Sequence, residues 1–312
     1  MTVRLSLPRE ELMVGGHLGC LGCGAALAMR YLLKGLGPRT ILSIPASCWA
    51  VLAGSYPNSY LNVPFVNTAF EVTGASLAGI RAALEIRGIE DVAVVGFAGD
   101  GGTADIGLQA LSGMLERGDD ALYVMYDNEA YMNTGIQRSG ATPQGAWTTT
   151  TPTRDLGSGK LQPKKDLMAI VVAHRVPYAA TASIGYPEDL VKKARKARET
   201  RGPKFLHLLC PCPPGWRYSS EKTVEIAKLA VDSHVFPLYE VVDGVYHVTR
   251  KSFKPKPVAE YLAIQDRFGH LTDEMVQGIS EQVERGWESL LKIEELTAER
   301  PLWGLGPQAV SS

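Results

Sequence analysis

The stretch from Val92 to Gly135 constrains the fold of this 312-residue chain more than any other. It reads VAVVGFAGDGGTADIGLQALSGMLERGDDALYVMYDNEAYMNTG, which indicates an apolar strand, a glycine-rich turn, an amphipathic helix and a second apolar strand. Two apolar strands connected through a helix are typical of parallel strands whose faces are both covered. The stretch therefore predicts an α/β fold with a mostly parallel sheet.

The same alternation extends from Arg39 to about Lys204, which predicts helices on both faces of one sheet. We place this main domain at residues 1–220, and we expect a long functional loop at 143–165, which is rich in Thr, Gly, Pro and Lys. Residues 221–312 are predicted to form a C-terminal arm that packs on the domain or on a partner subunit. The expected strands are 40–44, 92–97 and 121–126, and the expected helices are 73–87, 105–117, 221–232 and 273–296, with a Lys/Pro-rich stretch at 251–257.

Charge and hydropathy exclude two kinds of partner. The 32 basic and 33 acidic residues are scattered, so the chain has no basic field of the kind that nucleic acid or an anionic membrane requires. Apolar runs fall short of the roughly 20 residues that span a bilayer. The first ten residues, MTVRLSLPRE, lack the apolar core of a signal peptide, and this predicts a cytoplasmic protein.

The glycine-rich turn predicts a phosphate site with a metal ion beside it. Gly99, Gly101 and Gly102 let the backbone approach a ligand closely, and the following helix directs its N-terminal amides to the same spot. Asp100 and Asn128 each follow a strand, so they are expected to meet at one edge of the sheet and offer oxygen ligands to Mg²⁺. The backbone carbonyl of Ala130 supplies a third ligand.

Two other interpretations of this turn compete. A tight strand-to-helix connection needs no ligand, and a dinucleotide-binding turn would need G-x-G-x-x-G with an acid after the next strand. Here Asp100 lies inside the turn and Asn128 follows the strand. The spacing, GDG followed by 26 residues and then Asn, resembles the thiamine diphosphate signature of the transketolase, pyruvate decarboxylase and 2-oxoacid oxidoreductase superfamily.

Cysteine placement indicates a second metal site. Cys20 and Cys23 lie in GCLGCG, Cys48 follows a predicted strand, and Cys210 and Cys212 follow another, so four of these five thiols can gather at one end of the sheet. Such thiolates suit Zn²⁺ or a [4Fe–4S] cluster, and spacing alone does not separate the two. A thioredoxin-like pair would leave Cys48 and Cys212 unexplained, and unrelated buried thiols are the remaining alternative.

Taken together, GCLGCG, Cys48, GDGGTADIGLQALSG, YDNEAYMNTG, GAWTTTTP and CPCPPGW resemble the β subunit of pyruvate:ferredoxin oxidoreductase and its relatives, from about His17 to Trp216. The resemblance implies a thiamine diphosphate-binding fold that holds thiamine diphosphate, Mg²⁺ and one [4Fe–4S] cluster. It leaves Cys210 as an extra, structural thiol. The implied residues are Cys20, Cys23, Cys48 and Cys212 for the cluster, Asp100, Asn128 and the Ala130 carbonyl for Mg²⁺, Gly99, Gly101, Gly102, Thr103 and Thr134 for the cofactor, and Asn133 as the catalytic residue facing the substrate oxygens.

The resemblance also implies the activity and the partners. It predicts oxidative decarboxylation of a small 2-oxoacid in an anaerobic enzyme that passes electrons to ferredoxin, with α and γ/δ-type subunits. The partner supplies the glutamate that activates the cofactor, so the chain alone should be inactive. Pyruvate would require coenzyme A. Oxalate is the other candidate, because Ala25 stands where many pyruvate-type members carry an acid and the text after Cys48 departs from theirs.

Three alternatives remain open at this point. From the residues alone, Asn133 and Thr134 read as simple turn residues before Gly135. A non-redox thiamine-dependent lyase or synthase would share the GDG and Asn motif without needing four cysteines. A zinc-stabilised, non-catalytic subunit would keep the fold and the thiols.

Overall fold

The computed structural model describes residues 6–153, 159–251 and 254–303. Some sequence expectations reach outside these ranges. They concern residues 1–5 at the start of the chain, 154–158 of the predicted loop, 252–253 of the Lys/Pro-rich stretch and 304–312 of the C-terminal arm.

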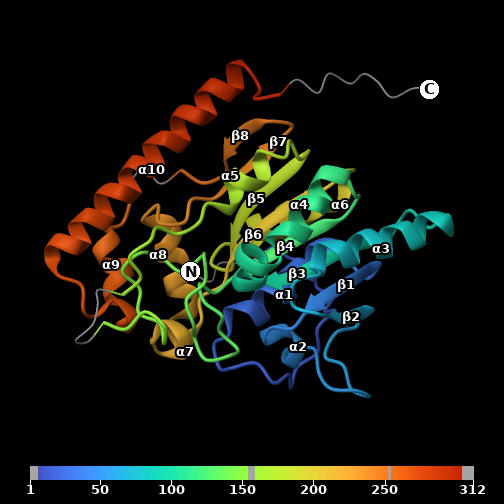
Figure 1. Cartoon of the computed structure of the whole chain (residues 1–312), viewed down its shortest axis with the longest axis horizontal. Coiled ribbons are helices and arrows are strands. Elements are labelled where there is room, and N and C mark those ends of the chain that lie inside the picture. Colours follow the sequence, from blue (N-terminus) through green and yellow to red (C-terminus); the bar gives the residue numbers. More distant parts are fainter. Residues whose placement is uncertain (1–5, 154–158, 252–253, 304–312) are drawn as a thin grey trace.

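A single mixed sheet organises the described residues (Figure 1). Its eight strands follow the order β2-β1-β3-β4-β6-β5-β7-β8, in which the first six are parallel and the last two antiparallel. The order reverses between β1 and β3, where crevices for ligands form in open α/β sheets. The strands are β1 Thr40–Pro45, β2 Phe65–Thr68, β3 Ala93–Gly99, β4 Leu122–Asp127, β5 Tyr178–Ser183, β6 Lys204–Leu209, β7 Tyr239–Val242 and β8 Val245–Val248.

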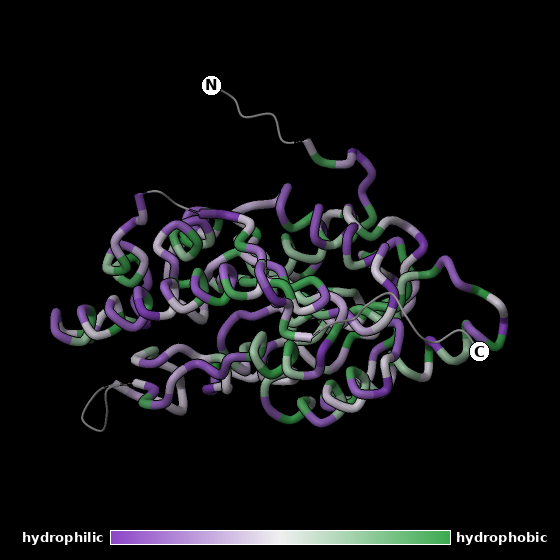
Figure 2. Tube along the Cα trace, turned by 90° about the horizontal axis from the view of Figure 1, so that it is seen from above, coloured by the Kyte–Doolittle hydropathy of each residue, from purple (hydrophilic) through white to green (hydrophobic). Residues whose placement is uncertain are grey.

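Helices cover both faces of the sheet because successive strand residues point to opposite sides. Val95 and Phe97 of β3 belong to the apolar cluster that contains α1, α2 and α6, whereas Val94 and Ala98 belong to the cluster with α3, α4 and α5. Hydrophobic and hydrophilic residues alternate along most helices, as expected when one side faces the sheet (Figure 2). The helices are α1 Gly24–Leu36, α2 Cys48–Leu52, α3 Thr73–Ile86, α4 Leu108–Arg117, α5 Leu167–Val172, α6 Pro187–Glu199, α7 Pro213–Trp216, α8 Thr223–Asp232, α9 Val258–Ala263 and α10 Asp273–Glu299.

The predicted α/β class with a mostly parallel sheet is confirmed, but the sequence analysis missed the hairpin of β7 and β8. This hairpin pairs β7 with β5 and so adds strands from beyond residue 220 to the main sheet. Asp243 and Gly244 both have positive φ, 47° and 83°, which matches the two-residue turn that joins such strands. The division of the chain at residue 220 stays a prediction.

The C-terminal part packs along one end of the sheet. Helix α10 lies against β8 and α9, and a third apolar cluster surrounds Trp216 with residues of α8 and α9 (Figure 1). A search of the described residues finds no helix with the length and apolarity that a bilayer crossing requires. This third cluster brings late residues of the chain against the loop that follows β4, where the candidate site lies.

Candidate functional site

The glycine-rich turn after β3 continues into a π-helical turn, Gly102–Ile106, before α4 begins at Leu108. The predicted helix start at Asp105 was therefore wrong by a few residues. The amide of Gly107 donates to the Gly102 carbonyl at 2.9 Å, the i to i+5 bond of a π turn. A Cβ at Gly107 would lie 2.1 Å from that oxygen, so this turn requires glycine there.

Gly101 and Gly102 leave room for neighbouring aromatic rings, and Gly101 has no unusual backbone conformation that would require glycine. Gly101 has an ordinary helical φ of −63°. A Cβ on Gly101 would lie 2.5 Å from the ring of Tyr131, and one on Gly102 would lie 3.2 Å from the ring of Phe70. Both aromatic rings therefore pack directly on the bare backbone of the turn and form a wall beside it.

A cavity of about 190 Å³ opens where the turn, the loop after β4 and the start of α2 meet. It joins two motifs that lie far apart in the sequence, because Cys48 borders it together with the glycine turn. Its walls are mainly apolar and aromatic. The lining residues are Ala46, Ser47, Cys48, Phe70, Gly99, Gly101, Gly102, Tyr126, Asn128, Ala130, Tyr131, Met132, Asn133 and Thr134.

Asp100, Asn128 and Ala130 converge beside this cavity. One terminal atom of the Asn128 amide lies 2.8 Å from Asp100 Oδ1 and 3.0 Å from the Ala130 carbonyl oxygen. With the amide nitrogen at that position, the side chain donates to both oxygens. With the amide oxygen there, three oxygens face one another, an arrangement that needs a cation between them. The side chain thus has one orientation suited to a metal and one that satisfies the site without it.

Ser139 fixes the carboxylate of Asp100 from the other side. Its hydroxyl donates to Asp100 Oδ2 at 2.5 Å, which leaves Oδ1 facing Asn128. Complete burial raises the pKa of Asp100 well above its ordinary value, and the nearby charge of Asp127 raises it further. A buried carboxylate of this kind ionises readily only beside a positive charge.

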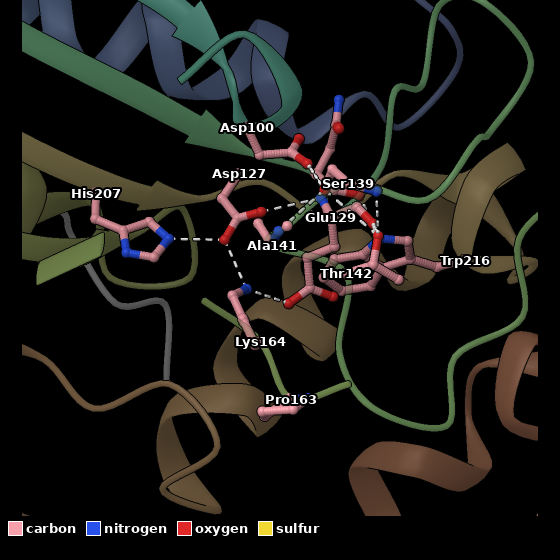
Figure 3. Close-up of polar contacts among 12 residues, drawn as sticks. Asp100, Asp127, Glu129, Ser139, Ala141, Thr142, Pro163, Lys164, His207 and Trp216 are labelled. Carbon is pink, nitrogen blue, oxygen red and sulfur yellow. Dashed lines mark hydrogen bonds and ion pairs between the residues drawn. The ribbon is translucent and has the colours of Figure 1, made fainter. Parts of the chain in front are cut away.

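A buried network of charges supports the loop after β4 (Figure 3). Asp127 Oδ2 lies 2.6 Å from Lys164 Nζ and 2.7 Å from His207 Nε2, and Lys164 also reaches Glu129 Oε1 at 2.6 Å. Burial alone would raise the pKa of Asp127, but the charges of Lys164 and His207 lower it to about 2. The network fixes Asp127 and Glu129, the residues on either side of Asn128.

The structure brings most of the predicted cofactor residues to the cavity wall, with Asp100 beside the cavity and Thr103 away from it. Asn133 and Thr134 line it and are exposed, and Thr134 Oγ1 donates to Gln137 Oε1 at 2.6 Å. Thr103 is fully buried instead, and its hydroxyl donates to the Gly99 carbonyl at 2.8 Å. The Thr103 side chain therefore stabilises the turn from behind and does not line the cavity.

A backbone hydrogen bond brings two cysteine segments side by side, because the amide of Gly24, next to Cys23, donates to the carbonyl of Pro211, which lies between Cys210 and Cys212, at 3.2 Å. Burial is the main cause that raises the pKa of Cys212, and Cys23, Cys48 and Cys20 raise it further. Burial likewise raises the pKa of Cys48 to about 12, with contributions from Cys23 and Cys20. Cys210 is completely buried within the apolar core, and this burial is the main cause that raises its pKa.

These thiols do not form a preassembled metal site. Within the described ranges, no group of three or more His, Cys, Asp or Glu side chains is arranged to hold an ion. Such an arrangement would bring thiolates together, and their mutual repulsion and burial disfavour it without a compensating positive charge. The cluster ligands named from the sequence therefore stay a prediction.

Sequence analysis missed several residues that shape the site. Ser139, Glu129, Lys164 and Trp216 contact the metal-ligand candidates or the loop that carries them, and Trp216 Nε1 donates to the Asn128 carbonyl at 2.8 Å. Trp216 and Glu129 each gave a signal, because Trp216 ends the CPCPPGW motif and Glu129 lies within YDNEAYMNTG. Lys164 lies in the loop that was predicted to be functional, but nothing in the sequence singled it out.

Comparison with known proteins gives consistent relatives. Residues 46–208 match the family described as thiamine pyrophosphate enzyme, C-terminal TPP binding domain. The chain is 53% identical to ketoisovalerate oxidoreductase subunit VorB of Pyrococcus abyssi over 94% of its length and 96% of that protein. It is 50% identical to pyruvate synthase subunit PorB of Methanothermobacter thermautotrophicus, over 90% of its length and 97% of that protein.

One solved structure supports the fold. The 2-oxoglutarate:ferredoxin oxidoreductase from Magnetococcus marinus, with 2-oxoglutarate, coenzyme A and succinyl-CoA bound, superposes with a TM-score of 0.56. The superposition covers 72% of the present chain and 82% of that chain at 19% identity. At this identity the likeness concerns the architecture alone.

Proposed function

Because the chain belongs to the β subunits of the 2-oxoacid:ferredoxin oxidoreductases, we propose that it binds thiamine diphosphate through Mg²⁺ and carries one [4Fe–4S] cluster beside it. The observation that carries this proposal is the cavity after β3, which borders both the glycine turn and Cys48. A shared cavity gives electrons a short path from one cofactor to the other.

The oxygen donors fit Mg²⁺. In an octahedral site with metal–oxygen distances of about 2.1 Å, neighbouring ligand oxygens lie about 3 Å apart. The separations of 2.8 and 3.0 Å at the Asn128 amide agree with that spacing. Asp100, Asn128 and the Ala130 carbonyl would hold the ion, and the adjoining cavity, which Gly99, Gly101 and Gly102 line, would take the diphosphate.

The thiols fit a cluster by their chemistry. Cys23, Cys48 and Cys212 are partly buried thiols whose pKa values are raised by burial first and then by their neighbours. Bound iron supplies the positive charge that makes such thiolates stable. We assign Cys20, Cys23, Cys48 and Cys212, which are exposed or partly buried, as the ligands and leave Cys210, which is completely buried in the apolar core, as a structural thiol.

The cavity favours a 2-oxoacid with an aliphatic side chain, such as pyruvate or ketoisovalerate. Phe70, Tyr131 and Met132 line it, and none of its lining residues in the described part of the chain is cationic. Oxalate, a dianion at neutral pH, would need cationic side chains from a partner subunit and is the second candidate. Asn133 lines the cavity, which supports its proposed role as donor to the oxygens of the substrate, and pyruvate would pass its acyl group to coenzyme A.

Bound thiamine diphosphate supplies the carbanion chemistry that decarboxylates a 2-oxoacid. The residues of this chain would bind and orient it, and Phe70 and Tyr131, which form an apolar wall of the cavity, would limit the access of water to it. We propose that α and γ/δ-type subunits complete the site and that ferredoxin receives the electrons. The chain alone is then inactive.

Metal analysis of the assembled complex, purified without oxygen, tests the cluster. We expect iron and sulfide, a reducible [4Fe–4S] signal by electron paramagnetic resonance, and loss of iron in Cys48→Ser and Cys212→Ser. Cys210→Ser is the matched control and should keep its iron. Zinc in place of iron would refute the redox role in favour of a zinc-stabilised subunit, and absence of both iron and zinc would favour a non-redox thiamine enzyme.

A further inference from the structure

The backbone between the two loop ligands is held in an unusual conformation. Glu129 separates Asn128 from Ala130 and has a φ of +65°, in the left-handed region that residues other than glycine seldom adopt. Such a conformation is strained for a residue with a side chain and persists only where the surroundings enforce it. Here it accompanies the convergence of the Asn128 amide and the Ala130 carbonyl.

Both peptide groups around Glu129 are fixed by hydrogen bonds. Its amide donates to Asp127 Oδ1 at 3.0 Å, and its carbonyl accepts from Thr142 Oγ1 at 2.6 Å. Its carboxylate is 4% exposed and lies between two cations, with Lys164 Nζ at 2.6 Å from one oxygen and Arg267 Nη2 at 2.6 Å from the other. The side chain of Glu129 therefore cannot turn without breaking a buried ion pair.

Arg267 supports the same loop by a second route. This residue, 2% exposed, follows α9 and stacks its guanidinium 3.9 Å above the ring of Trp216. Trp216 in turn donates its indole N–H to the carbonyl of Asn128. The Nε of Arg267 donates to Gln265 Oε1 at 3.0 Å, which fixes the plane of the guanidinium. The Arg267 guanidinium thus supports Asn128, through Trp216, and contacts the carboxylate of Glu129 directly.

We propose that Glu129 and Arg267 are positioning residues for the magnesium ion, so that the C-terminal segment sets the geometry of the cofactor loop. The proposal rests on the proposed function. A buried ion pair is a poor source of stability, because desolvation offsets most of the attraction, so the pair is better explained by the orientation it imposes. Mg²⁺ demands near-ideal octahedral geometry, whereas Ca²⁺ accepts flexible sites. Loss of a positioning residue should therefore weaken Mg²⁺ binding more than Ca²⁺ binding, whereas general destabilisation of the fold should weaken both equally.

The test uses the assembled complex, stripped of its metal and thiamine diphosphate with a chelator. Binding of added thiamine diphosphate is followed by calorimetry while Mg²⁺ or Ca²⁺ is titrated. We expect Glu129→Gln and Arg267→Lys to need roughly 10- to 100-fold more Mg²⁺ for half-maximal binding, the usual effect of losing a group that orients metal ligands. The requirement for Ca²⁺ should rise less, so that the preference for Mg²⁺ over Ca²⁺ falls.

Asp120→Asn is the matched control. Asp120 forms a partly buried ion pair with Lys204 at the opposite end of β4 from Asn128, so it tests loss of a pair without change at the loop. Its Mg²⁺ and Ca²⁺ requirements should equal those of the wild type. Thermal melting of each apo complex shows whether a variant is folded, and the conservative Arg267→Lys keeps a positive charge if Glu129→Gln does not fold.

The outcomes separate the two proposals. Unchanged ion requirements in Glu129→Gln and Arg267→Lys, or equal shifts for both ions, would overturn the positioning role while the cofactor assignment stands. A wild-type complex that binds no thiamine diphosphate with either ion would refute the proposed function, and the positioning role with it.

Discussion

The close packing of α3 against α4, the helix that follows the glycine turn, can be tested by substituting glycine residues in α3. Gly74, near the start of α3, lies against the backbone of α4, where a Cβ would come within 2.3 Å of the Ala110 carbonyl oxygen and 2.6 Å of its carbon. Gly79 is on the same helix, is exposed, and would meet nothing within 4 Å. The two glycines thus differ in surroundings while sharing a helix.

The expected effects have opposite signs. Alanine in place of a helical glycine stabilises by about 0.5–1 kcal/mol, and this is the full effect that we expect for Gly79→Ala. Overpacking against a backbone carbonyl costs about 1–3 kcal/mol, because helices cannot yield locally as a flexible side chain can. Gly74→Ala should therefore lower the free energy of unfolding by roughly 1 kcal/mol, the difference between the middle values of these two ranges.

Urea unfolding of the purified chain, followed by far-ultraviolet circular dichroism, measures both changes. The midpoint should fall for Gly74→Ala and rise for Gly79→Ala, with similar slopes for all three proteins. If Gly74→Ala proved as stable as Gly79→Ala, then α3 and α4 would not approach as closely as described. The packing argument for the position of the turn would then be wrong.

Three further predictions concern single side chains. Lys160 is buried and its pKa is lowered to about 8, mainly by desolvation, so the amine loses its proton at a lower pH in the folded protein than in the unfolded chain. Between pH 7.5 and 9.5 the wild type should therefore gain stability relative to Lys160→Met in urea unfolding, and a constant difference would contradict this. Trp216→Phe leaves the buried carbonyl of Asn128 without its donor and should cost about 1–3 kcal/mol in urea unfolding, so an unchanged midpoint would contradict the contact. Asp166 caps α5 by accepting from the amide of Ala169 at 2.9 Å, and Asp166→Ala should cost about 1 kcal/mol by the same assay, whereas no loss would show that the cap is dispensable.

The parts of the fold that could be predicted are those with a local signal. The strand, turn, helix and strand between Val92 and Tyr126 carry apolar runs and helical periodicity, and the ends of adjacent parallel strands meet by geometry, so the proximity of Asp100 and Asn128 was predictable. The hairpin around Asp243 was also within reach, because an Asp-Gly pair between short apolar runs is a known hairpin signal.

Other parts depend on contacts between segments far apart in the chain. Arg267 meets Glu129 across 138 residues, and Trp216 meets Asn128 across 88, and neither pairing leaves a trace in local sequence. The π-helical turn was missed for a different reason. It follows from the 2.9 Å bond between Gly107 and Gly102, while the sequence shows only glycines that an ordinary turn would also use.

The placement of Arg267 has a consequence for biosynthesis. Asn128 leaves the ribosome long before the guanidinium that steadies its loop, since β6, α7 and α9 must first be made and folded onto the sheet. A nascent chain can therefore complete its early helices while the loop after β4 is still unsupported. Under the proposed function, Mg²⁺ and thiamine diphosphate would then be captured only after translation is nearly finished.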